Sequence, residues 1–258
     1  MAEGETRRQA LERLRPYVER ARSFSGWDLG MLNVHHLTPG PPWDYEAVVR
    51  DAAPPDGWAL DMGTGGGEVL SRLRDGLPEH VVATEAWHVN APIADGRLRP
   101  LGVDVVWTCN LRLPFRDASF DIVINRHEEL VPPQVARVLK PLGRFVTQQV
   151  ARPQLWELRR FFPRMRDFGD QRWEYARGFE AAGLIVRRDE QHDYKVACGS
   201  LGDLVFLLCV TPWSIPDFDI EHDLEALLAV EREYGTDGGI VVTESRYLLV
   251  AEKPAVNG

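Results

Sequence analysis

The sequence predicts an α/β fold in which a mostly parallel β-sheet carries helices on both faces. Two observations lead to this class. Short apolar segments alternate with helical patterns over residues 55–150, which is typical of βαβ units. The first of these segments ends in a glycine-rich turn at Gly63 to Gly67, where a strand passes into a helix. Right-handed crossovers between parallel strands then place helices on both faces of the sheet.

Seven segments have the apolar, strand-like composition that such a sheet requires. Five of them lie within residues 55–150, and two follow nearer the C-terminus. They are residues 58–62, 81–84, 103–107, 120–124, 144–150, 184–188 and 240–252. We therefore expect a sheet of seven strands.

Capping and spacing signals predict the helices. Thr6 and Gln9 have capping-box spacing, and Pro16 is expected to kink or split the helix that follows them. Asp219 offers an N-cap for a later helix that ends at Gly235. Further helices are expected at residues 134–140 and 173–182.

Composition and charge exclude several classes of protein. The 258 residues are 44% hydrophobic and 27% charged, which is typical of a globular protein. No apolar run approaches the roughly 20 residues of a membrane helix, and no signal peptide is recognised, so we expect a cytoplasmic location. The net charge of −9 argues against a nucleic-acid partner, because phosphate binding needs a basic surface. The three cysteines are scattered, so no metal is expected.

The most informative segment is the turn from Asp61 to Gly67. Its glycines let the backbone turn sharply and let a ligand approach the main chain. Glu85, at the end of the next predicted strand, can accept hydrogen bonds from both ribose hydroxyls of a nucleoside. Because Asp61 would repel a pyrophosphate, the turn favours a ligand with an ammonium group. A nucleoside with an amino-acid tail and a sulfonium centre, S-adenosylmethionine, meets these requirements.

The chain resembles class I S-adenosylmethionine-dependent methyltransferases over about residues 55–150. The Asp61-x-Gly63-x-Gly65-x-Gly67 turn matches the family's first motif, and Glu85 matches its ribose-binding acid. Residues 113–121 and 137–144 match the approaches to the family's fourth and fifth strands. A closer likeness, to bacterial methyltransferase-domain proteins of the small-molecule type, lies in residues 40–45, 125–128 and 147–150.

This resemblance implies a Rossmann-like class I methyltransferase fold with seven strands, mostly parallel, and an antiparallel last strand. We expect an N-terminal helical cap or lid segment at residues 1–50 and an S-adenosylmethionine-binding domain at residues 51–258. Residues 151–235 of that domain are expected to cover part of the substrate.

The resemblance also implies cofactor contacts. Asp61 would position the amino group, Glu85 would hold the ribose, and Tyr45 in the N-terminal segment could contact the donor. The other implied cofactor-binding residues are Gly63, Thr64, Gly65 and Gly67 at the methionine portion, Ala86, Trp87, Asn110 and Leu111 at the adenine, and Asn125 and Arg126 beside the methyl group.

His127 and Glu128 are the candidate catalytic residues. Methyl transfer is an in-line displacement, so a base is needed only where the acceptor carries a proton at the moment of attack. Histidine suits that role because its ordinary pKa lies near neutrality. The alternative is that Arg126, His127 and Glu128 form a structural hydrogen-bond cluster under the pocket.

The function that the resemblance implies is methyl transfer from S-adenosylmethionine to an O, N, C or S atom of a small molecule, with S-adenosylhomocysteine as product. One alternative is methylation of RNA or protein, for which the basic run from Arg159 to Arg166 would serve. Two others are cofactor binding without methyl transfer and different chemistry on the same cofactor. The acceptor and the oligomeric state stay open.

Overall fold

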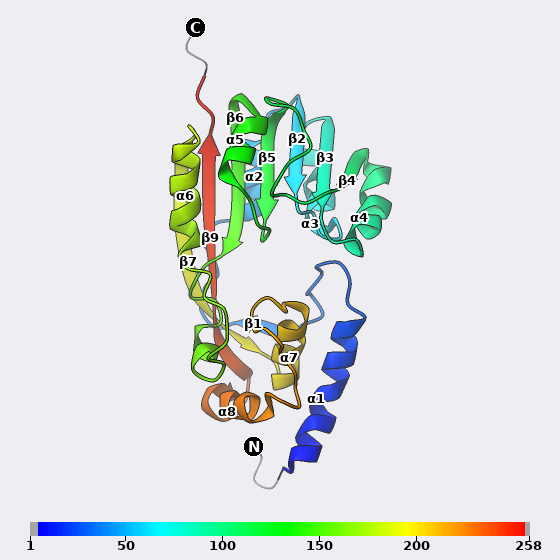
Figure 1. Cartoon of the computed structure of the whole chain (residues 1–258), viewed down its shortest axis with the longest axis vertical. Coiled ribbons are helices and arrows are strands. Elements are labelled where there is room, and N and C mark those ends of the chain that lie inside the picture. The colour runs from blue at the N-terminus through cyan, green and yellow to red at the C-terminus, as the bar shows by residue number, and fades with distance from the viewer. Residues whose placement is uncertain (1–4, 256–258) are drawn as a thin grey trace.

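The computed structural model describes residues 5–255, which form a nine-stranded mixed sheet with helices on both faces (Figure 1). The strands follow the order β1-β7-β9-β6-β5-β2-β3-β4, and β8 pairs with β9. Neighbours from β6 to β4 in this order pair in parallel. These parallel strands are β2 (Trp58–Met62), β3 (His80–Glu85), β4 (Val103–Trp107), β5 (Phe120–Arg126) and β6 (Leu139–Val150).

The remaining strands extend the sheet on one side with antiparallel pairs. Strand β9 (Gly239–Glu252) runs antiparallel to both β6 and β7 (Ile185–Cys198), which confirms the expected antiparallel last strand. Strand β1 (Val34–His36) pairs with β7, and β8 (Gly235–Thr236) pairs with β9. These two short strands account for the difference between the expected seven strands and the nine within residues 5–255.

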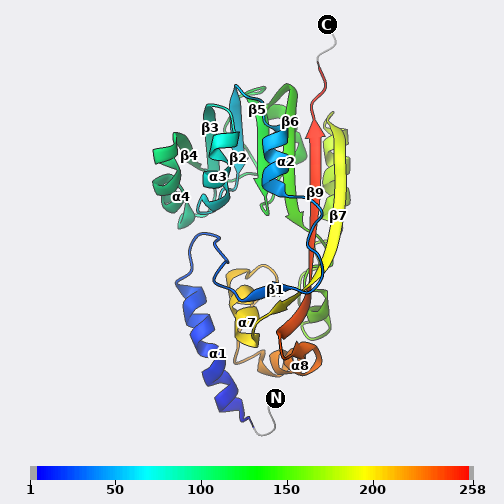
Figure 2. The ribbon, with the colours of Figure 1, turned by 180° about the vertical axis from the view of Figure 1, so that it is seen from behind.

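Helices cover the two faces of the sheet, as Figures 1 and 2 show from opposite sides. Helices α2 (Tyr45–Ala52), α3 (Glu68–Leu73) and α4 (Asn90–Leu98) share a buried apolar cluster with Ala59 and Ile122 of the sheet. Helices α5 (Pro132–Val138) and α6 (Gln171–Ala181) share another with Leu60 and Val123. Successive strand residues face opposite sides, so adjacent residues enter different clusters.

A second group of helices lies beyond this sheet region, at the opposite end of the molecule from the C-terminus (Figure 1). Helices α1 (Arg7–Arg22), α7 (Leu201–Val210) and α8 (Leu224–Tyr234) pack on the far ends of β7 and β9. We call this group the lower part, and we call β2 to β6 with α2 to α6 the parallel part. Short 3₁₀ helices complete the described elements: η1 (Arg74–Gly76), η2 (Arg99–Leu101) and η3 (Trp156–Arg160).

Two local details of the helices differ from what the sequence led us to expect. Of the two outcomes expected at Pro16, a kink or a split, the split is wrong: α1 is continuous, and its N-terminus carries the expected capping box of Thr6 and Gln9. Asp219 does not cap α8, whose N-cap is Asp223. The Asp219 carboxylate instead accepts hydrogen bonds from the backbone N–H groups of Glu221 (2.8 Å) and His222 (3.1 Å), which closes a turn before the helix.

The helices of residues 5–255 were also compared with the requirements for crossing a bilayer. None of them combines the length and the apolar character that a membrane span needs.

Candidate active site

The glycine turn lies at the carboxyl end of β2, between that strand and α3. Gly63, Gly65 and Gly67 have φ angles of 74°, 62° and 80°, in the left-handed region that favours glycine. The N–H groups of Gly63 and Thr64 donate to the carbonyl of Thr84 on the neighbouring strand, at 3.1 and 2.9 Å. These two hydrogen bonds fix the turn to the sheet.

Three carboxyl groups surround this turn. Glu85 accepts hydrogen bonds from the backbone N–H groups of Gly65 (2.7 Å) and Trp87 (2.8 Å), which orient its carboxylate. Asp61 is the penultimate residue of β2, and the side chain of Glu128 packs so closely on Gly63 that any side chain there would overlap it. The sequence thus brings Asp61, Glu85 and Glu128 together from three strand ends.

Burial perturbs all three acids, and the charge of Glu85 adds to its effect on the other two. Burial, together with the nearby Glu85 charge, raises the pKa of Asp61 to about 7. Burial and the same Glu85 charge raise the pKa of Glu128 to about 7. Burial also raises the pKa of Glu85. A positively charged ligand would stabilise the ionised forms of these groups.

Unpaired polar atoms mark the same region. The Thr64 Oγ1 and the Nδ2 atoms of Asn90 and Asn110 are buried and make no hydrogen bond of good geometry among residues 5–255. Thr64 and Asn110 nevertheless lie close enough to the Asp61 and Glu128 carboxyls to lower the pKa values of those groups, so Asn90 is the donor with no such neighbour. Buried polar atoms without a partner are costly, so a ligand that pairs with them is favoured. Glycines, acids and unpaired donors together fit a cationic nucleoside such as S-adenosylmethionine.

The predicted adenine contacts lie at the ends of β3 and β4. Ala86 and Trp87 follow β3 and are exposed, as is Leu111, so their apolar surfaces are free to flank a ring. Asn110 is buried, and its Oδ1 accepts a hydrogen bond from the Thr84 hydroxyl at 2.6 Å. The Asn110 amide is therefore oriented by the neighbouring strand.

Asn125 and Tyr45 are committed to holding strand ends together. The Asn125 side chain is fully buried, donates to the carbonyl of Met62 (3.1 Å) and accepts from the Thr147 hydroxyl (2.8 Å). Tyr45 is also buried, and its hydroxyl donates to the Asn125 carbonyl at 3.1 Å. This network joins the ends of β2, β5 and β6.

His127 follows β5 in an unusual backbone conformation. Its φ of 59° is left-handed, which is uncommon for a residue with a side chain, and its N–H donates to the Gln148 carbonyl at 2.9 Å. Desolvation by the surrounding protein lowers the pKa of His127 well below its ordinary value, and Arg246 and Arg126 lower it further. Within residues 5–255, no hydrogen bond joins the side chains of Arg126, His127 and Glu128 to one another.

Sequence reasoning missed two residues at this site. The Trp27 indole lies on Gly65, where an added Cβ would come within 2.6 Å of Trp27 Cδ1. Asn90 at the start of α4 accepts a hydrogen bond from the Gly26 N–H at 2.8 Å, which fixes the segment that carries Trp27. No local pattern marks either residue, because the contacts join segments far apart in the chain.

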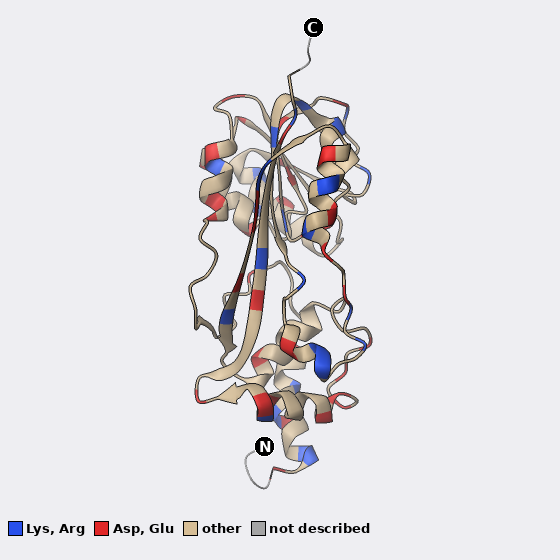
Figure 3. Ribbon diagram, turned by 90° about the vertical axis from the view of Figure 1, so that its left-hand side faces the viewer, with Lys and Arg blue, Asp and Glu red and all other residues tan. Residues whose placement is uncertain are grey.

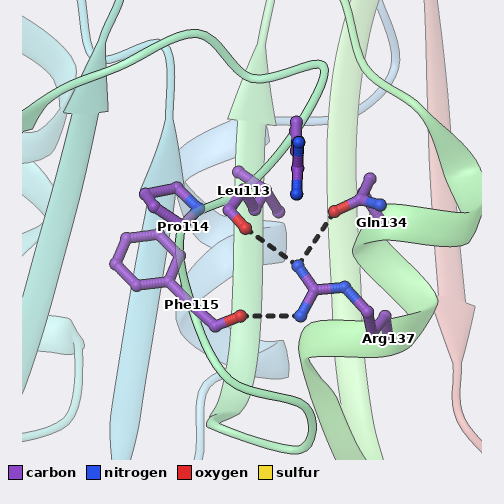
Figure 4. Close-up of a pocket in the computed structure, with 6 residues that line it drawn as sticks. Leu113, Pro114, Phe115, Gln134 and Arg137 are labelled. Carbon is purple, nitrogen blue, oxygen red and sulfur yellow. Dashed lines mark hydrogen bonds between the residues drawn. The ribbon is translucent and has the colours of Figure 1, made fainter.

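A cavity of about 590 Å³ lies elsewhere, between the loop after β4 and α5 (Figure 4). The Arg137 guanidinium donates to the carbonyls of Leu113 (2.9 Å) and Phe115 (2.6 Å) and to Gln134 (2.9 Å). Arg137 therefore fixes the loop that leads into β5, which gives it a structural role. Among residues 5–255, no group of three or more His, Cys, Asp or Glu side chains is arranged to hold a metal ion.

Comparison with known proteins agrees with this fold and turn. Residues 60–147 match the family model described as "Methyltransferase domain". The match indicates a methyltransferase domain within those residues, and with it an enzyme that transfers methyl groups. No curated protein sequence matches the chain significantly.

Solved structures share the fold at low identity. A putative methyltransferase from Bacillus halodurans is 17% identical, with a TM-score of 0.59 over 82% of this chain and 99% of its own. A putative sarcosine dimethylglycine methyltransferase from Galdieria sulphuraria is 17% identical, with a TM-score of 0.54 over 81% and 83%. The [4+2]-cyclase SpnF is 16% identical, with a TM-score of 0.54 over 96% and 94%. At these identities the likeness shows the fold alone.

Proposed function

We propose that this chain transfers the methyl group of S-adenosylmethionine to a nucleophilic O, N, C or S atom of a small molecule, releasing S-adenosylhomocysteine. The observation that carries the proposal is the acid-lined glycine turn of Asp61, Glu85 and Glu128. The pKa values of about 7 for Asp61 and Glu128 support it, because a sulfonium or ammonium group would favour their ionised forms.

The turn and its neighbours would bind and orient the cofactor. Gly63, Thr64, Gly65 and Gly67 would hold the methionine portion, with Asp61 at its amino group. The Glu85 carboxylate, oriented by two backbone N–H groups, would accept the ribose hydroxyls. The residues proposed around the adenine are Ala86, Trp87, Asn110 and Leu111.

His127 and Glu128 would then have different roles, one toward the acceptor and one toward the cofactor. When bound, S-adenosylmethionine supplies an electrophilic methyl group. His127 is neutral at pH 7, so a ring nitrogen can accept a proton from the acceptor, and its lowered pKa makes it a weaker base than an ordinary histidine. Glu128 packs on Gly63 and would face the positive charge of the cofactor. Asn125 and Tyr45 would keep the strand ends in register beneath both.

The surface charges favour a small molecule over RNA as the acceptor. Most of the basic run at residues 159–166 is already paired: Arg159 with Asp167 (3.3 Å), Arg160 with Glu233 (2.6 Å), and Arg164 with Asp223 (2.5 Å). Acidic and basic residues are interspersed on the face seen in Figure 3. Phosphate binding gains little from arginines that carboxylates already neutralise.

Calorimetric titration with S-adenosylmethionine and S-adenosylhomocysteine tests the proposal. Glu85→Ala is expected to weaken both ligands about 30-fold or more, because each hydrogen bond to a charged group contributes about 1.5–3 kcal/mol. Glu79→Ala, an exposed acid before the opposite end of β3, is the matched control and should bind as the wild type does. Absence of binding by folded, ligand-free wild type would refute the proposal.

Turnover distinguishes the alternatives that share the cofactor. Wild-type protein with a library of small acceptors should form S-adenosylhomocysteine only when an acceptor is present. Consumption without an acceptor would indicate other chemistry on the cofactor, and methylation of RNA or protein alone would contradict the small-molecule proposal.

A further inference from the structure

A second cavity, of about 360 Å³, lies on the sheet face that α2 covers, beside the N-terminus of that helix. Arg126 of β5, Gln148 of β6 and Arg246 of β9 line it from the sheet. Trp43 and Tyr45 line it from the start of α2. The volume is sufficient for a small molecule.

Strand periodicity explains why this part of the sheet face is polar. In β5 the buried Ile124 and then Arg126 point to the α2 side, and in β6 Val146 and then Gln148 do the same. Arg126 and Gln148 are register partners, so the change from apolar to polar occurs at one level across the two strands. The apolar core ends there, and the cavity begins.

The acids that line the cavity are already engaged. Glu46 pairs with Arg72 at 2.8 Å, and Glu244 pairs with Arg246 at 3.0 Å. Asp44 caps α2 by accepting hydrogen bonds from backbone N–H groups at 2.8 and 3.3 Å. None of these carboxylates forms an ion pair with Arg126, although the Glu46 charge raises the pKa of Arg126 and the Arg126 charge lowers that of the buried Asp61.

Arg126 is a cation of the cavity wall that has no ion-pair partner among residues 5–255. Its side chain is exposed to the cavity, and it has no hydrogen bond and no ion pair with any of residues 5–255. Desolvation lowers the pKa of Arg126, and the nearby positive charges of Arg246 and Arg72 lower it further. An anion in the cavity would relieve this repulsion and pair with a planar guanidinium suited to carboxylate or phosphate.

The aromatic walls of the cavity are held in place. Trp43 Nε1 donates to Gln148 Oε1 at 2.9 Å, and the Tyr45 hydroxyl is bound to the Asn125 carbonyl. The Tyr194 hydroxyl donates to Glu244 at 2.5 Å. Fixed rings offer flat apolar surfaces at little entropic cost, which suits a planar ligand.

The geometry points to this cavity as the binding site of the methyl acceptor, a small aromatic molecule whose carboxylate or phosphate group pairs with Arg126. This inference rests on the proposed methyl transfer and names the acceptor class for it. The family resemblance implies that Arg126 lies beside the methyl group of the cofactor, whereas this inference pairs Arg126 with the anionic group of the acceptor. His127, next along the chain, does not line this cavity, but it lies near enough to Arg126 and Arg246 for their charges to lower its pKa.

Calorimetry on protein saturated with S-adenosylhomocysteine tests this assignment, with benzoate, phenyl phosphate and neutral benzamide as probes. Wild type is expected to bind benzoate or phenyl phosphate at least tenfold more tightly than benzamide, and which anion binds better identifies the group. Arg126→Gln should remove this preference, and Arg126→Lys should keep part of it. Arg112→Gln, an exposed arginine at the other cavity, is the matched control and should behave as wild type.

Other outcomes would overturn the inference. Equal binding of inorganic phosphate and phenyl phosphate would remove the aromatic part of the acceptor. A tenfold loss of S-adenosylhomocysteine affinity in Arg126→Gln, with unchanged benzoate binding, would assign the arginine to the cofactor. Normal S-adenosylhomocysteine binding without binding of either anion would refute this inference alone, whereas failure to bind S-adenosylhomocysteine would refute the proposed function.

Discussion

The parallel part and the lower part of this molecule are assembled from contacts of different range. In the parallel part, β2 to β6 pair among themselves within residues 58–150, and the acid-lined turn lies on their carboxyl ends. In the lower part, α1 packs against α7 and α8, and Arg13 of α1 pairs with Glu231 of α8 at 2.8 Å. One part is thus built from neighbouring segments, while the other is gathered from both ends of the chain; we propose that the first binds the cofactor and the second covers it.

The largest expected effect tests whether the two parts are separate cooperative units. Leu14 of α1 is fully buried in the lower core, so Leu14→Ala should lower the free energy of unfolding by about 2–5 kcal/mol. Hydrogen exchange should show lost amide protection in α1, α7 and α8, with protection in β2 to β4 largely retained.

Leu73→Ala is the matched substitution in the parallel part, because Leu73 of α3 is equally buried on the sheet. It should reverse the pattern and expose amides in β2 and β3 first. If either substitution removes protection equally everywhere, β7 and β9, which run through both parts, couple them into one unit and the comparison fails.

The range of contacts also explains what the sequence could predict. The turn from Asp61 to Gly67, Glu85 and the parallel strands follow from local signals, and the fold class is confirmed. The expected segment 184–188 is only the beginning of β7, which continues to Cys198. The charged residues in its middle lack the apolar pattern of a strand. They form one because they pair with β9, which lies far along the chain.

Two helices show the same limit in different ways. Helix α7 is apolar on nearly every face, so it has no periodicity that would distinguish a buried helix from a strand. Helix α2 begins at Tyr45 after the Asp44 cap, but the Pro- and Trp-rich segment before it obscures its start. The cavity of Arg126 and Arg246 needs both α2 and β9 in place, and no sequence pattern joins these elements.

A smaller effect is expected from pH, which should change the cofactor affinity of the parallel part. The pKa values of Asp61 and Glu128 are about 7, so only about a tenth of each is ionised at pH 6 and about nine tenths at pH 8. Asp61 is proposed at the amino group, which both ligands carry, so Glu128 governs the ratio of their affinities. The affinity for S-adenosylmethionine, measured relative to neutral-sulfur S-adenosylhomocysteine, should therefore rise about tenfold from pH 6 to pH 8.

The stability of ligand-free protein should move in the opposite direction. Both folded pKa values lie above the ordinary carboxyl values of 3.8 and 4.5, so the folded state holds these protons more tightly. Their contribution to stability is present below about pH 4 and is lost as the pH rises through 7. Glu128→Gln should weaken both pH dependences, and an affinity ratio that does not change with pH would show that Glu128 does not face the sulfonium.

The smallest effect concerns Trp27, where the two parts meet. Its ring lies on Gly65 of the parallel part and 5.8 Å from the ring of Trp213, which follows α7 in the lower part. Aromatic pairs contribute about 0.5–1.5 kcal/mol, so Trp27→Ala should weaken S-adenosylhomocysteine binding about fivefold, mainly through faster dissociation. Trp58→Ala, an exposed tryptophan at the opposite end of β2, is the control.

A double-mutant cycle decides whether Trp27 acts as a cover or only as a contact of the turn. If the lower part closes over the cofactor through this pair, Trp213→Ala should cost nearly as much as Trp27→Ala, and the double variant should cost little more. Additive losses, or no loss in Trp213→Ala, would mean that Trp27 serves the turn alone. The lower part would then have no share in cofactor binding, and its function would have to lie with the acceptor.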